Sequence, residues 1–211
     1  MLRQKFELGL FDNPFVDESK VDEIVGKQEF KTLGEHTQQE AMTLLKNEEI
    51  LPLSFKKSDL KVYVENMDVV IVALFATVFE KVEYADLAII RLNTTLYPSN
   101  TKVNFALGFH HGDLDFKKEE KQRILKLLNT VPTVVDIYLD RPAVIPEIAT
   151  ASKALIANYG ASDKSVCEVL FGNISPKGKL PFELPSSMEA VYNQKTDLPY
   201  DSENPILEFG V

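Results

Sequence analysis

The spacing of hydrophobic and polar residues changes along this chain near position 59. Before that point, helical spacing begins near Gln28 and continues to about Asn47. Apolar residues at i, i+3 and i+4 predict one buried face for this helix. That face is formed by Ala41, Leu44 and Leu45. We therefore expect residues 1–58 to be a linker and lead-in helix rather than part of a core.

From residue 59 onward, short apolar runs alternate with amphipathic segments, a pattern typical of strands and helices in turn. The expected strands are 61–64, 77–79, 87–92, 133–139 and 154–159, and the expected helices are a short one near Val69, then 117–129, 146–152 and one after Ser162. Such alternation predicts an α/β fold, a three-layer sandwich with a mostly parallel sheet and helices on both faces. We assign this domain to residues 59–185 and expect residues 186–211 to wrap around it as an irregular tail.

Residues that start or stop helices support these boundaries. Asp115 and Ser162 are suitable N-caps for the two longest helices of the domain. Pro146 suits the first turn of a helix, since its missing N–H is not needed there. Gly172 suits the stop of the helix that follows Ser162.

Composition narrows the range of partners. Lys and Arg total 23 against 32 Asp and Glu, a formal charge of −9, and hydrophobic residues make up 45% of 211 residues. An acidic chain lacks the basic stripe that displaces phosphate counterions, so we expect no nucleic-acid partner. The longest apolar run, 69–79, is shorter than the about 20 residues that cross a bilayer, so we expect no membrane partner. No secretory leader is evident, and we expect a cytoplasmic protein.

Cofactor and metal chemistry have little support in the sequence. The single cysteine, Cys167, cannot form an intrachain disulfide, and its place on the inner face of a helix indicates a small buried residue. With one cysteine and three histidines, we expect no metal site. Neither a glycine-rich dinucleotide fingerprint nor a phosphate-binding loop follows a strand, so we expect no cofactor.

One polar cluster stands out, on the loop that leads from the 87–92 strand to the next helix. It contains His110, His111, Gly112, Asp113 and Asp115. Imidazoles and carboxylates on a loop at a strand end are well placed to hydrogen-bond a ligand. The alternative is equally consistent with the sequence: Asp115 caps the helix, Gly112 makes a turn, and the histidines are solvated.

Two arginines lie near strand ends, where open α/β sheets bind ligands. Arg91 interrupts the apolar run 87–92, and a charge there requires a carboxylate partner or a ligand. Arg141 follows the 133–139 strand, and a structural salt bridge is the default interpretation for it. Asp136, inside that strand, indicates an edge position or a local pair.

Three blocks of the chain resemble glycoside hydrolase family 3, the β-glucosidase type. The blocks are 6–14 (FELGLFDNP), 40–53 (EAMTLLKNEEILPL) and 170–181 (LFGNISPKGKLP), the last followed by Pro185. The first is similar to the link between the two domains of that family. The order of the blocks identifies the chain as the C-terminal α/β sandwich domain together with this link.

The resemblance implies a division of labour between two domains. A (β/α) barrel carries the nucleophilic aspartate, and the α/β sandwich closes the active site and contacts the sugar. A barrel needs about 200 residues or more, which residues 1–58 cannot provide. We therefore expect the whole enzyme to be an exo-acting β-glycosidase that hydrolyses terminal O-glycosidic bonds, with the barrel domain and a carbohydrate as partners. The isolated chain is expected to be inactive.

The general acid/base is the open question of this resemblance. Many relatives have a glutamate just before a Gly-Asp on the loop that Gly112-Asp113 resembles, and here histidines precede it. His111 and Asp113 are the catalytic candidates, and a histidine titrates near neutral pH. The expected substrate-binding residues are His110, His111, Asp113, Arg91 and Arg141.

Two other functions remain open at this stage. One is a non-catalytic carbohydrate-binding or scaffold module that keeps the fold without the chemistry. The other is a receiver-like signalling domain, for which Glu65 and Asp68 partly supply the acidic pair. The segment Leu92-Asn93-Thr94 lacks the aspartate that receiver chemistry requires.

Overall fold

The computed structural model describes residues 1–53, 60–95 and 112–211. Its contacts divide the chain into two units, Met1–Glu35 and His36–Val211. The helices, including two 3-10 turns, are α1 Leu2–Glu7, η1 Glu18–Lys20, α2 Val21–Ile24, α3 Gln28–Ala41, α4 Val69–Val72, η2 Val82–Tyr84, α5 Lys118–Leu128, α6 Pro146–Ala151, α7 Asp163–Leu170 and α8 Met188–Asn193. The two units are described separately below.

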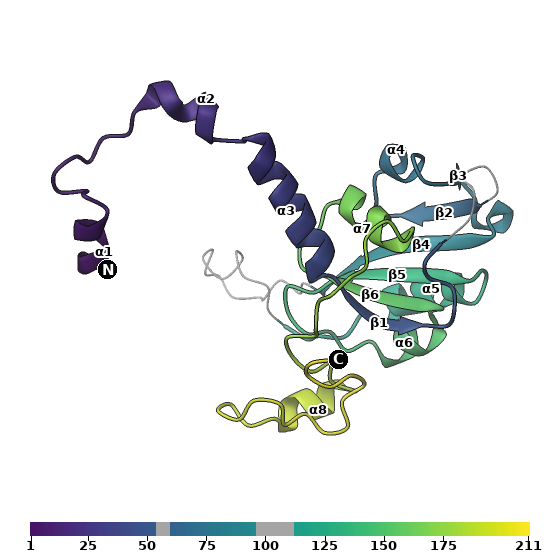
Figure 1. The fold of residues 1–211 in the computed structure, drawn as a ribbon. Coiled ribbons are helices and arrows are strands. Elements are labelled where there is room, and N and C mark those ends of the chain that lie inside the picture. Colours follow the sequence, from purple (N-terminus) through teal and green to yellow (C-terminus); the bar gives the residue numbers. More distant parts are fainter. Residues whose placement is uncertain (54–59, 96–111) are drawn as a thin grey trace. The chain divides into compact units, whose positions relative to one another are not determined.

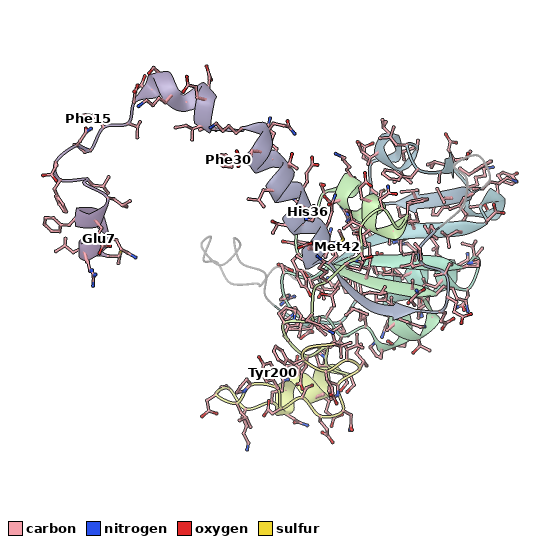
Figure 2. The ribbon with its side chains drawn as sticks, in the orientation of Figure 1. Glu7, Phe15, Phe30, His36, Met42 and Tyr200 are labelled. Carbon is pink, nitrogen blue, oxygen red and sulfur yellow. The ribbon has the colours of Figure 1, made fainter. Side chains whose placement is uncertain are left out.

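The first unit builds no core of its own. Among residues 1–35, all of which the structure describes, none is buried. Its first three helical segments, α1, η1 and α2, have six, three and four residues. The rings of Phe6 and Phe11 contact each other with centroids 4.5 Å apart. Phe15 and Phe30, labelled in Figure 2, belong to this unit, and the Phe15 side chain is 83% exposed. A segment this apolar needs a surface to pack on.

In the second unit, six strands of the described chain form one sheet (Figure 1). The strands are β1 Thr43–Asn47, β2 Lys61–Glu65, β3 Thr77–Phe79, β4 Leu87–Asn93, β5 Thr133–Tyr138 and β6 Ala154–Asn158. Their order across the sheet is β1-β6-β5-β4-β2-β3. Every neighbouring pair is parallel except β1 with β6, which is antiparallel. The predicted mostly parallel α/β sheet is confirmed.

Each face of this sheet carries a buried apolar layer, because successive strand residues point to opposite faces. On one face, Ile90 and Ile137 join a cluster with Ile124 of α5 and Ile148 of α6. The other face packs β4 and β6 residues against Val72 of α4 and against Val166, Cys167 and Leu170 of α7. The structure therefore has helices on both faces of the sheet, as predicted (Figure 1).

The helix predicted to continue to Asn47 ends earlier, and this part of the prediction was wrong. α3 ends at Ala41, and residues 43–47 form the edge strand β1. Leu44 pairs with Ile156 and is 39% exposed, whereas Leu45 is buried. The apolar pattern in residues 41–45 is too short to distinguish a helix from a strand. Antiparallel pairing with β6 selected the strand. Part of the expected lead-in segment thus belongs to the sheet.

Most of the predicted helix boundaries agree with the structure. Ser162 caps α7 by accepting a hydrogen bond from the Ser165 N–H, and Pro146 is the first residue of α6. Gly172 follows the end of α7 with a φ of 79°, a conformation that favours glycine. Asp115 does not cap α5, which begins at Lys118; it bridges to Val144 instead.

The run of apolar residues 69–79 is a short helix and a strand, α4 and β3, as expected. In the described part of the chain, no helix has the length and apolarity that a membrane span requires. The tail after α7 packs on the domain: Leu180 and Leu184 are buried, and Leu184 forms a bridge with Leu207. α8 lies within this tail.

Candidate functional site

The candidate site lies beyond the carboxyl ends of β4 and β5, two parallel neighbours. Their last residues, Asn93 and Tyr138, are register partners. The Thr94 N–H extends the pairing by donating to the Tyr138 carbonyl at 3.2 Å. The Thr94 hydroxyl donates to the carboxylate of Asp140, in the loop that follows β5. This edge of an α/β sheet is where ligands bind.

The Arg141 guanidinium brings two distant stretches of chain together at this edge. Its Nη1 donates to the Gly112 carbonyl at 3.0 Å, and its Nη2 donates to the Asp113 carbonyl at 3.1 Å. Nη2 also donates to the Thr95 carbonyl. The Thr95 hydroxyl adds a bond to the Asp113 carbonyl at 2.8 Å. Arg141 thus bonds three peptide oxygens of the described chain, and the expected salt bridge stays a prediction.

The chain that leaves this point runs beside the loop after β5. The Val144 N–H donates to the Leu114 carbonyl at 3.0 Å, next to the bridge between Asp115 and Val144. α8 contacts the same stretch from the tail: the Leu114 N–H donates to the Met188 sulfur at 3.2 Å. Residues 112–115 are therefore held between the β5–α6 loop and the tail.

Asp113 is exposed, and its side chain has a partner in α8. The Tyr192 hydroxyl donates to Asp113 Oδ1 at 2.7 Å. This bond and the negative charge of the carboxylate raise the pKa of Tyr192. A surface cavity of about 350 Å³ lies next to Asp113 and is lined also by Asp115, Phe116, Lys117 and Lys118. Carboxylates and ammonium groups around one cavity can accept and donate hydrogen bonds to a polyhydroxylated ligand.

Arg91 belongs to a different, more buried cluster on the α4 and α7 face of the sheet. Its Nε donates to Asp136 at 2.6 Å, and Nη1 donates to Asp163, the first residue of α7. The Asn158 amide donates to the second Asp136 oxygen at 2.6 Å. Asp136 is completely buried, and this burial raises the pKa of its carboxyl against the effect of Arg91. The carboxylate partner that Arg91 required is therefore supplied by the chain.

The structure brings together some of the predicted site residues. Asp113 and Arg141 meet through the Asp113 backbone, whereas Arg91 bonds a separate set of carboxylates. His110 and His111 lie outside the described residues. Asp136 is in the centre of the sheet as half of a local pair, so the edge alternative for it was wrong. Contact of any of these side chains with a substrate stays a prediction.

Sequence reasoning missed Thr95 and Tyr192. Tyr192 lies 79 positions after its partner Asp113, within a punctuated tail that has no local pattern of a site. Thr95 follows an apolar strand and is typical of a strand end. Cys167 is buried as expected, and burial raises the pKa of its thiol to about 12. Among the described residues, no group of three or more His, Cys, Asp or Glu side chains is placed to hold a metal ion.

Residues 63–211 match the glycosyl hydrolase family 3 C-terminal domain. The chain belongs to this family, which confirms the resemblance seen in the three sequence blocks.

Curated relatives match along the whole chain. The chain is 44% identical over 212 residues to Beta-glucosidase C of Emericella nidulans, covering 100% of this chain and 34% of that protein. It is 35% identical over 213 residues to a periplasmic beta-glucosidase/beta-xylosidase of Dickeya chrysanthemi, covering 100% of this chain and 32% of the relative. The chain thus spans about a third of the length of these relatives.

A solved structure shows the same fold. The beta-glucosidase from Listeria innocua in complex with glucose superimposes with a TM-score of 0.74 at 17% sequence identity. The likeness covers 100% of this chain and 37% of the Listeria chain. At this identity the likeness is evidence for the fold alone.

Proposed function

We propose that this chain is the C-terminal domain of a longer exo-acting β-glycosidase, which hydrolyses terminal O-glycosidic bonds of carbohydrates. The observation that carries the proposal is the match of the whole chain to one third of Beta-glucosidase C, at 44% identity. A relationship this close over the full length supports a shared role for the domain. The expected cytoplasmic location stays a prediction, and the relative from Dickeya chrysanthemi is named as periplasmic.

In this proposal the domain closes an active site whose nucleophile lies on a separate (β/α)-barrel domain. A retaining glycosidase places two carboxyl groups about 5 Å apart across the scissile bond, one as nucleophile and one as acid/base. His110 and Asp113 contact the sugar, and His111 or Asp113 is the candidate for proton transfer. The exposed position of Asp113 at the carboxyl edge of the sheet, beside a polar cavity, supports this assignment.

The first 35 residues are proposed to lie against the barrel domain. They bury no side chain within their own unit, although they are rich in large apolar residues. Its exposed large apolar residues include Phe6, Phe11, Phe15, Val16, Val25 and Phe30. Burying such side chains is favourable by about 1.5–3 kcal/mol each, which a packed domain surface would supply. A linker of this composition is therefore suited to fastening two domains together.

The proposal is tested with two proteins: the 211-residue chain alone, and a fusion in which this chain replaces the matching part of Beta-glucosidase C. Both are assayed for hydrolysis of p-nitrophenyl β-glucoside and β-xyloside. We expect no turnover above background for the chain alone and clear turnover for the fusion. Turnover by the chain alone would show that the division between two domains is wrong. A folded but inactive fusion that still binds sugar would favour the non-catalytic module.

Single substitutions in the active fusion test the loop. We expect His110→Ala and Asp113→Asn each to lower kcat/KM at least tenfold. The first removes a hydrogen-bonding imidazole, and the second removes the negative charge that makes the carboxylate a strong acceptor in the transition state. The matched controls are His36→Ala, on the exposed side of α3, and Asp197→Asn, exposed in the tail. If all four variants keep the parent rate, the loop has a structural role only.

A further inference from the structure

The loop after β5 is joined to the chain on both sides of segment 96–111. Before that segment, the Thr94 hydroxyl bonds Asp140 and the Thr95 carbonyl accepts from Arg141. After it, the Gly112 and Asp113 carbonyls accept from the same guanidinium. We propose that Arg141 is a positioning residue that fixes the separation of Thr95 and Gly112. Its importance for catalysis rests on the proposed function, but the clamp itself does not.

Arginine is suited to this task for a geometric reason. Its guanidinium presents five N–H donors in a rigid planar fork, so one side chain can hold several carbonyls in fixed positions. Lysine carries the same charge on a flexible stem with three donors at one nitrogen. A lysine could bond one carbonyl group well. It could not fix the distance between the Thr95 carbonyl and the carbonyls of Gly112 and Asp113. The role therefore depends on the fork rather than on the charge.

Other contacts fasten the same two points. The Thr95 hydroxyl bonds the Asp113 carbonyl directly at 2.8 Å, so the two ends also touch each other. The Tyr192 hydroxyl holds the Asp113 carboxylate at 2.7 Å from the tail. Arg141 is the member that bonds Thr95, Gly112 and Asp113 together, since its donors reach a carbonyl of each. Its side chain thus fixes the backbone at Asp113, one of the proposed sugar-contacting residues.

A positioning role has a distinct consequence for catalysis. A displacement of about 1 Å in a catalytic group can cost a hundredfold in rate, even when the substitution is distant from the chemistry. We therefore expect loss of the fork to lower the rate while the sheet stays intact. A substrate-contacting arginine would give a different result, because its removal would weaken sugar binding without loosening the backbone.

The clamp is tested by amide hydrogen exchange on the 211-residue chain, comparing Arg141→Gln with the parent. The reporters are the Thr94 N–H, bonded to the Tyr138 carbonyl, and the Val144 N–H, bonded to the Leu114 carbonyl. We expect both to exchange at least tenfold faster in Arg141→Gln, while the amides of central β4 and β5 keep the parent rate. If the Thr94 and Val144 amides exchange at the same rate in Arg141→Gln as in the parent, the proposal is overturned.

Two further variants separate the possible causes. Arg141→Lys keeps the charge without the fork, and we expect it to accelerate the two reporters as Arg141→Gln does. Protection restored by Lys would show that charge alone is responsible and would overturn the fork argument. Arg123→Gln, whose guanidinium pairs with Glu65 and Glu120 on the surface, is the matched control and should leave the reporters unchanged. Equal acceleration of all sheet amides in Arg141→Gln would indicate global destabilisation and also overturn the proposal.

In the active fusion, Arg141→Gln should lower kcat at least tenfold with less than a threefold change in KM. A large rise in KM with unchanged kcat would instead assign Arg141 to substrate binding and overturn the positioning role. The exchange result is independent of glycosidase activity. If the parent fusion is inactive, the proposed function fails, and the clamp is still decided by the exchange measurement.

Discussion

Removal of the Arg91 charge should be among the most destabilising single changes to this domain. Arg91 lies between the fully buried Asp136 and the partly exposed Asp163, and its own side chain is 14% exposed. Arg91→Met keeps most of the apolar stem and removes the cation. Asp136 then keeps the Asn158 amide as a partner but loses its positive neighbour.

The magnitude follows from this burial. Breaking a buried ion pair by removing one partner costs about 3–5 kcal/mol, because the remaining charge is left without compensation. A whole domain is stable by about 5–15 kcal/mol, so the loss is a large share of the total. Asp163 contributes less to this cost, since its side chain is 22% exposed and water can solvate it. We expect a loss of about 3 kcal/mol or more at pH 7.5.

The loss should depend on pH, with a sign set by Asp136. Burial already raises the pKa of this carboxyl, and removal of Arg91 raises that pKa further. The folded variant therefore holds a proton at pH values where the unfolded chain has released it. Stability then falls as pH rises from about 4 through the folded-state pKa, by up to about 1.4 kcal/mol for each pH unit. The cost of Arg91→Met should accordingly be smaller at pH 5 than at pH 7.5.

Urea unfolding followed by circular dichroism at the two pH values measures this effect. The control Arg123→Met removes a half-exposed arginine of α5 that pairs with Glu65 of β2 and Glu120 of α5, and it should cost less than about 1 kcal/mol. The double variant Arg91→Met/Asp136→Asn leaves no buried charge and keeps an acceptor for Asn158, so it should be more stable than Arg91→Met alone at pH 7.5. The reasoning is refuted if Arg91→Met costs no more than Arg123→Met, or if the double variant is the less stable one.

The reactivity of Cys167 and a substitution at Gly178 test the packing of the domain. The Cys167 thiol is fully buried and has a pKa of about 12. At pH 8 it should therefore react with a thiol reagent at least a hundredfold more slowly in the folded chain than in urea. Equal reaction rates in the folded and the urea-unfolded chain would contradict the buried position of Cys167. Gly178→Ala should cost about 1–3 kcal/mol in urea unfolding, because the new Cβ would lie 2.0 Å from the Ala41 carbonyl oxygen. Gly34→Ala is the control: it meets nothing within 4 Å on α3 and should stabilise slightly.

Local patterns were sufficient for most of the sheet. The strands β4, β5 and β6 are buried on both faces, so they appear as continuous apolar runs that no loop would carry. The helix starts at the Ser162 cap and at Pro146, the first residue of α6, were also predicted, because a helix terminus is satisfied by residues within one turn. The family resemblance had the same origin, in short blocks of adjacent residues.

Edge strands and sites depend on residues far apart in the chain, and local patterns did not resolve them. The apolar residues of 41–45 suited a helix face or a strand, and pairing with β6, more than a hundred residues later, selected the strand. For the same reason Asp115, a suitable N-cap by its position, bridges to Val144. Each error arose where a tertiary partner competed with a local one.

The buried polar residues show most clearly which features the sequence determines and which the tertiary structure decides. The sequence by itself determined that Arg91 needed a carboxylate partner or a ligand, since a charge inside an apolar strand is costly unless it is paired. Only the tertiary structure decided that Asp136 and Asp163, 45 and 72 positions away, would be its partners, and that Arg141 would bond the Gly112 carbonyl. The physical reason is that burial sets the demand for a partner locally, whereas the folded sheet decides which partner is within hydrogen-bonding distance.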